Sequence, residues 1–86
     1  MLDYSFFYDI AEYGNKKWKG SYTPKEVACN AYEYLADFEY SKAKGSYHIS
    51  STIQELLRLL DEDGSEQSIE WANAIREELR LCQTQM

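Results

Sequence analysis

The sequence predicts an all-α fold, a small four-helix domain around a central helix over residues 24–44, with residues 1–86 as a single domain. Two observations lead to this fold class. Apolar residues recur at helical spacing in most of the chain. Start and stop signals bracket those apolar runs, most clearly around residues 23–45.

The boundaries of the central helix are marked by cap residues. Thr23 is a good N-cap, Pro24 suits the first helical position, and Glu26 completes a capping box with Thr23. Gly45 is a typical C-terminal stop, and Lys42 lies in the last turn, where positive charge suits the helix dipole.

The central helix carries an apolar surface that is wider than one neighbour requires. One face contains Val27, Ala31, Tyr34, Leu35 and Phe38. We expect the apolar surface to continue around the side through Cys29, Tyr32, Ala36, Tyr40 and Ala43. The remaining polar strip contains Glu26, Asn30, Glu33, Asp37, Ser41 and Lys44. A helix that packs on one neighbour needs a stripe only a little over ~100° wide. We therefore expect this helix to contact at least two others.

Residues 2–13 fit two patterns. As a helix they share a broad apolar side, and Gly14 and Asn15 follow as a stop signal. As a strand they alternate, and tyrosine and phenylalanine favour strands. We prefer the helix. The alternative is an α+β fold, with a β-hairpin over residues 2–22 packed on three helices.

Residues 14–22 read as a connector, because two glycines, an asparagine and a serine interrupt the periodicity. The segment is the basic cluster of an acidic chain. It holds Lys16, Lys17, Trp18, Lys19 and Tyr22. Basic and aromatic side chains together are typical of nucleic-acid contacts. The competing interpretation is that Trp18 covers the core while the lysines keep the loop hydrated, and we favour it.

Two more helices are expected over residues 51–63 and 65–82. The first would be capped by Ser51 with Gln54, or by Thr52 with Glu55, and would end at Gly64. Its core stripe contains Ile53, Leu56, Leu57 and Leu60. Ser65 would cap the second, whose buried side contains Trp71, Ala72, Ile75, Leu79 and Cys82. The short link over residues 63–65 predicts an antiparallel hairpin.

Composition narrows the class of protein. The net charge of −6 suits solubility and disfavours non-specific binding to nucleic acid or anionic membranes, but permits a basic partner. The N-terminal apolar run has no preceding basic residues, and no run is long enough for a membrane span, so we expect a cytoplasmic protein. Both cysteines, Cys29 and Cys82, lie on predicted helices, where we expect buried thiols.

No catalytic or cofactor motif is present in the sequence, so we expect no enzyme and no cofactor. A metal site is not expected either, because His48 is the single histidine and has no companion ligands at suitable spacing. His48 reads as a surface or capping residue.

Two functions remain. The first is a non-enzymatic interaction module that binds another protein, or a second copy as a homodimer, through a tyrosine-rich surface. All eight tyrosines lie in residues 4–47. The candidates for exposed contact are Tyr4, Tyr8, Tyr13, Tyr32 and Tyr40, with the basic cluster beside them as further candidates. The alternative is an acidic nucleic-acid mimic that occupies a basic groove, because residues 61–70 hold five acids and no base.

Overall fold

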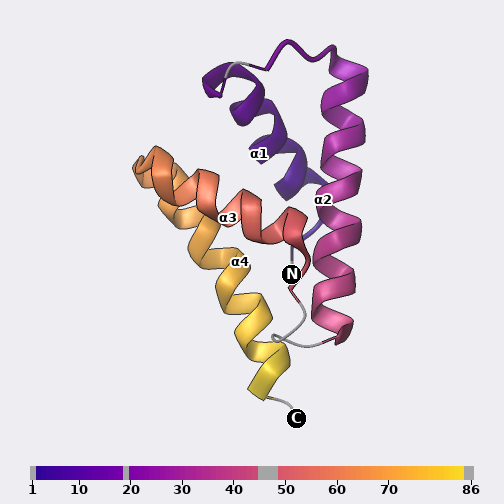
Figure 1. The fold of residues 1–86 in the computed structure, drawn as a ribbon, viewed down its shortest axis with the longest axis vertical. Helices are drawn as coiled ribbons and strands as arrows, with labels where there is room; N and C mark the ends of the chain where they lie inside the picture. Colours follow the sequence, from indigo (N-terminus) through magenta and orange to yellow (C-terminus); the bar gives the residue numbers. More distant parts are fainter. Residues whose placement is uncertain (1, 19, 45–48, 85–86) are drawn as a thin grey trace. The chain divides into compact units, whose positions relative to one another are not determined.

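The computed structural model describes residues 2–18, 20–44 and 49–84, and within them the chain forms four helices and no strand (Figure 1). The helices are α1 (Tyr4–Lys17), α2 (Pro24–Lys44), α3 (Ser51–Asp63) and α4 (Glu66–Thr84). The protein is all-α, and the alternative with a β-hairpin over residues 2–22 is wrong. Gly45, the predicted helix stop, and His48, the predicted surface or capping residue, lie outside the described residues.

The chain divides into two compact units, residues 1–36 (unit 1) and residues 37–86 (unit 2). The boundary falls within α2, so unit 1 contains α1 and the first part of α2. Unit 2 contains the rest of α2 together with α3 and α4. The prediction of one domain with helix 24–44 at its centre concerns both units together and stays a prediction.

Helix α1 begins and ends later than the sequence suggested. Asp3 is its N-cap, and the Phe6 N–H donates to Asp3 Oδ1 at 3.1 Å. Gly14 and Asn15 do not stop the helix, which continues to Lys17. Gly14 is buried, and a Cβ built on it would lie 2.6 Å from Cε3 of Trp18. The glycine is therefore a place of close packing inside the helix rather than a stop signal.

Helix α2 begins as predicted, at a capping box. The Glu26 N–H donates to Thr23 Oγ1 at 3.2 Å, and the Thr23 N–H donates to Glu26 Oε1 at 3.0 Å. These two bonds satisfy backbone donors that the first turn leaves without helical partners. The capping residues thus fix where the helix begins.

The buried surface of α2 is narrower than predicted. Val27, Ala31 and Phe38 are buried, and they lie close together around the helix axis. The expected second side is exposed, and it contains Cys29, Tyr32, Ala36, Tyr40 and Ala43. These five residues lie about 140–220° around the axis from Val27, on the opposite side of the helix. The prediction that they continue the buried surface is therefore wrong.

Ser41 was assigned to the polar strip of α2, but it is fully buried. Its hydroxyl donates to the Asp37 carbonyl at 2.9 Å and accepts from the Ser50 N–H at 2.9 Å. Ser50 is in turn the N-cap of α3, because its Oγ accepts from the Ile53 N–H at 3.2 Å. The predicted caps Ser51 and Thr52 are one and two residues too late. One buried hydroxyl therefore connects α2 to the start of α3.

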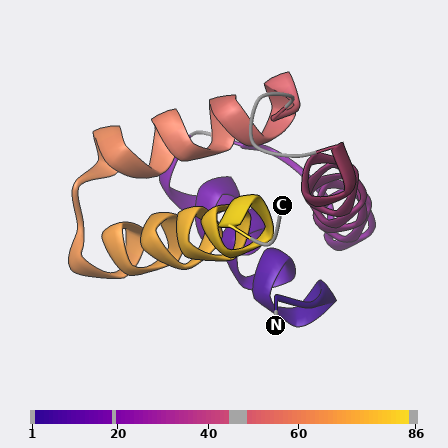
Figure 2. The ribbon, with the colours of Figure 1, turned by 90° about the horizontal axis from the view of Figure 1, so that it is seen from below.

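Helices α3 and α4 form the predicted antiparallel hairpin, and both ribbon views show them side by side (Figure 1 and Figure 2). Gly64 ends α3 in the left-handed region, with φ at 70°, as expected for a C-terminal glycine. The Ser68 N–H donates to Ser65 Oγ at 3.1 Å, which confirms Ser65 as the cap of α4. The buried core of the hairpin consists of Ile53, Leu56, Leu57, Leu60, Ala72, Ile75 and Leu79. Within this set, the stripe predicted for α3 is confirmed.

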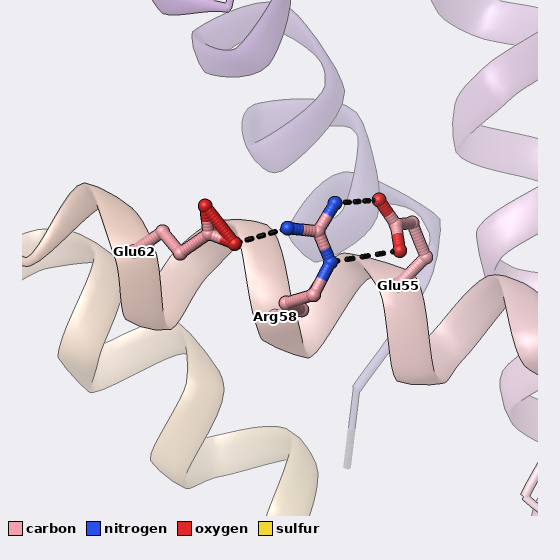
Figure 3. Close-up of polar contacts among 3 residues, drawn as sticks. All are labelled: Glu55, Arg58 and Glu62. Atoms are coloured by element: carbon pink, nitrogen blue, oxygen red, sulfur yellow. Dashed lines mark hydrogen bonds and ion pairs between the residues drawn. The ribbon is translucent and has the colours of Figure 1, made fainter.

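Charged residues reinforce the hairpin at its surface. Arg76 of α4 donates two hydrogen bonds to the Asp61 carboxylate of α3, at 3.1 and 2.6 Å. Along α3, Arg58 lies between Glu55 and Glu62 and bonds both (Figure 3). These groups are about half exposed, so solvent screens each pair and its contribution to stability is small.

Because Gly14 and Trp18 lie so close together, we expect replacement of this helical glycine by alanine to destabilise the protein. Replacing an exposed helical glycine by alanine normally stabilises a protein by about 1 kcal/mol. Here the added methyl group collides with the Trp18 ring, so we expect Gly14→Ala to lower the free energy of unfolding in urea by about 1–3 kcal/mol. In a Trp18→Ala background the same change is expected to be stabilising. Stabilisation in both backgrounds would show that the two residues do not pack together.

The Asp61–Arg76 pair gives a prediction about pH. Hydrogen bonds from Arg76 hold the pKa of the Asp61 carboxyl below its ordinary value of 3.8. Stability from the pair is therefore present above the unfolded-state pKa and is lost as the pH falls through the folded-state pKa. At pH 7 we expect Asp61→Asn to cost up to about 1 kcal/mol in thermal or urea unfolding. The difference from the original chain is expected to disappear in strong acid, and a cost that persists there would contradict the ion-pair explanation.

Candidate functional site

Three tyrosines of unit 1 come together from two helices, and we call Tyr4, Tyr8 and Tyr32 the tyrosine cluster. Tyr4 and Tyr8 are one turn apart on α1, with ring centroids 5.9 Å apart. The ring of Tyr32, from α2, lies 4.6 Å from that of Tyr4, at an interplanar angle of 38°. The cluster therefore joins α1 to α2 through tilted contacts between aromatic rings.

The cluster combines fixed rings with an open surface. Tyr32 is 63 % exposed, while Tyr4 and Tyr8 are half-buried. Desolvation raises the pKa of Tyr4 above its ordinary value of 10. The ionisable groups of Tyr32, Tyr8 and Cys29 raise it further. At neutral pH the Tyr4 hydroxyl, like that of any tyrosine with an ordinary or raised pKa, can both donate and accept a hydrogen bond.

Cys29 lies beside the cluster, and the prediction that its thiol is buried is wrong. Its side chain is exposed, about 200° around α2 from Val27. The sequence alone gives this angle, which places Cys29 opposite the buried face. The apolar residues around Cys29 nevertheless favour a buried thiol, and this led to the wrong prediction. The side chain of Cys82 lies outside the described residues.

The second candidate surface lies at the end of α1. We call residues 15–18 and 20–22 the basic corner. Lys16 and Lys17 are exposed in the last turn of α1, and Trp18 is the C-cap, half-buried with its N–H donating to the Gly14 carbonyl at 2.8 Å. Tyr22 is 51 % exposed. Lys19, which the sequence also predicts to contact a partner, lies outside the described residues.

Asn15 organises this corner, whereas its position in the sequence predicts only a helix stop. Its side-chain amide donates to the Tyr22 carbonyl at 3.1 Å, and its Oδ1 accepts from the Tyr22 N–H at 3.0 Å. The pair of bonds connects residues seven positions apart. No local spacing rule predicts such a pairing, so only the three-dimensional structure shows it.

Within unit 1, the predicted contact residues fall into two groups. Lys16, Lys17, Trp18 and Tyr22 belong to the basic corner, and Tyr32 belongs to the tyrosine cluster. Tyr40 lies in unit 2, is 54 % exposed, and has the Lys44 Nζ 5.7 Å from its ring centroid. Tyr13 is half-buried against Trp18, with ring centroids 6.1 Å apart.

The acids of residues 61–70 are partly used within unit 2. Asp61 pairs with Arg76, and Glu62 pairs with Arg58. Asp63 accepts a hydrogen bond from the buried Ser68 hydroxyl at 2.7 Å. Unit 2 nevertheless has ten acidic and five basic residues, against five and four in unit 1. Most of the net charge of −6 therefore resides in unit 2.

Among the described residues, no group of three or more histidine, cysteine or acidic side chains is placed to hold a metal ion. A shallow hollow along α4 is lined by Asn73, Arg76, Glu77 and Arg80, and both arginines there already form ion pairs. Within the described part of the chain, no helix has the length and apolar character that crossing a bilayer requires.

No protein-family model, curated protein or solved structure matches this chain.

The exposure of Cys29 can be checked by thiol labelling. We expect iodoacetamide to alkylate Cys29 in the folded protein nearly as fast as in the urea-unfolded chain, because its side chain is open to solvent. Mass spectrometry of proteolytic peptides separates Cys29 from Cys82. Alkylation of Cys29 only after unfolding would show that this face of α2 is covered.

Proposed function

We propose that the protein is a non-enzymatic interaction module that binds another protein, or a second copy of itself, through the tyrosine cluster. The observation that carries the proposal is the contact of the Tyr4, Tyr8 and Tyr32 rings from two helices, with Tyr32 63 % exposed. Two helices thus hold apolar rings at a surface where solvent reaches them.

The physical case rests on the properties of tyrosine. Its ring offers a large contact area with few rotatable bonds, so little conformational entropy is lost when a partner binds. The contact of the Tyr32 ring with the Tyr4 ring reduces that loss further, because it restricts both rings before binding. The Tyr4 hydroxyl adds a hydrogen-bond donor at the same surface. Such aromatic groups are enriched at protein interfaces and among their strongest contributors.

The charge distribution favours a basic partner for this module. Unit 1, which carries the cluster, is nearly neutral, so a partner meets little repulsion there. The chain as a whole has a net charge of −6, which attracts a basic protein over longer distances. Association with such a partner would weaken as salt rises.

The alternative, an acidic mimic of nucleic acid, has less support. A mimic needs free carboxylates spaced like phosphates, whereas Asp61 and Glu62 are engaged with arginines and Asp63 accepts from Ser68. The excess negative charge of unit 2 is the observation in its favour.

Two single substitutions test the proposal. Tyr32→Ser removes an exposed ring from the cluster, and Tyr40→Ser removes a similarly exposed ring elsewhere on α2. We expect Tyr32→Ser to weaken association at least tenfold, as loss of an interface hot spot does. Tyr40→Ser is expected to bind like the original chain. The measurements are quantitative capture of partners on the immobilised chain and sedimentation equilibrium for self-association.

Circular dichroism establishes that both variants fold. Equal binding by the original chain and Tyr32→Ser would refute the tyrosine cluster as the binding surface. An equal loss in Tyr40→Ser would mean that exposed tyrosines contribute without regard to the cluster.

A further inference from the structure

The basic corner suggests a second binding surface, independent of the tyrosine cluster. In an acidic chain it exposes Lys16 and Lys17, two consecutive residues in the last turn of α1. Neither lysine takes part in the ion pairs formed among the described residues. The half-exposed ring of Tyr22 belongs to the same corner. These groups offer ammonium donors together with an amphipathic ring.

Side-chain contacts also connect the described residues of the corner to one another. Asn15 bonds both backbone groups of Tyr22, and Trp18 packs on Gly14. A Cβ on Gly20 would come within 2.4 Å of Asn15 Oδ1, so the chain passes very close to that amide. These contacts restrict the corner before a ligand binds. Binding therefore costs less conformational entropy than it would in an unrestricted loop.

We propose that the basic corner binds a short acidic peptide segment of a partner protein. Lys16 and Lys17 would contact its carboxylates, and Tyr22 would lie against its backbone or side chains. A short segment is favoured over a nucleic acid, because the net charge of −6 repels a long polyanion. A few carboxylates sense mainly the charges within a Debye length of about 8–10 Å.

A purely structural explanation also exists, since lysines near a helix C-terminus stabilise it through the helix dipole. That role predicts a loss of stability when the lysines are removed, but no loss of ligand binding. The test therefore needs a binding readout as well as a stability readout.

The experiment is an NMR titration of the labelled 86-residue chain with a synthetic peptide of four glutamates flanked by glycines. We expect saturable shifts of the amide signals of residues 15–18 and 20–22. Lys16→Ala/Lys17→Ala is expected to weaken binding about fivefold or more, as loss of two exposed charge contacts would. The matched control Lys25→Ala/Lys44→Ala removes the same charge from exposed helical positions and is expected to bind like the original chain.

A third variant separates conformation from charge. Asn15→Ala keeps every lysine but removes both bonds to Tyr22, and we expect it to weaken peptide binding severalfold. Unchanged affinity in Asn15→Ala, or equal losses in the two lysine pairs, would overturn the proposal. Tighter binding of a single-stranded oligonucleotide at the same salt would overturn it too. Tyr32→Ser is expected to leave these shifts unchanged, so this proposal and the tyrosine-cluster proposal can fail separately.

Discussion

The narrow buried stripe of α2 is the constraint on which the rest of the structure depends. Val27, Ala31 and Phe38 occupy one side of the helix and are buried, whereas Tyr32 and Tyr40 occupy the opposite side and are exposed. A short chain buries a smaller share of its surface than a long one, so an 86-residue chain leaves many apolar side chains exposed. Tyr32 is one of them, and it is part of the proposed binding surface.

Side chains that bond to backbone determine where the helices begin and how they connect. The hydroxyls of Thr23 and Ser65 accept hydrogen bonds from backbone N–H groups in the first turns of α2 and α4, as their positions in the sequence predict. The buried Ser41 hydroxyl fixes the approach to α3, and the Asn15 amide fixes the chain after α1. The tyrosine cluster and the basic corner, the two proposed binding surfaces, depend on this local order. Their rings and lysines lie on or beside helices whose ends are fixed by these hydrogen bonds.

Much of the fold could be predicted from local pattern. The capping box at Thr23, the stop at Gly64 and the core stripe of α3 depend on neighbours three or four residues away, and the spacing of residues encodes those directly. Ser41 and Asn15 instead bond to residues nine and seven positions away, which the fold brings together. Gly14 has a local partner, Trp18, four residues further along the chain. For Gly14, packing against Trp18 overrides the usual tendency of glycine to end a helix. The tyrosine cluster was predicted only as a set of candidates, because the contact of Tyr4 with Tyr32 requires two helices to meet.

Hydroxyl-radical footprinting of the free protein at low concentration tests the central claim most directly, because the rate of side-chain oxidation follows solvent exposure. The structure predicts fast oxidation of Tyr32 and Tyr40, and strong protection of Phe38 on the opposite side of the same helix. Protection of Tyr32 equal to that of Phe38 would contradict the account, because the rings proposed as the binding surface would then be part of the core.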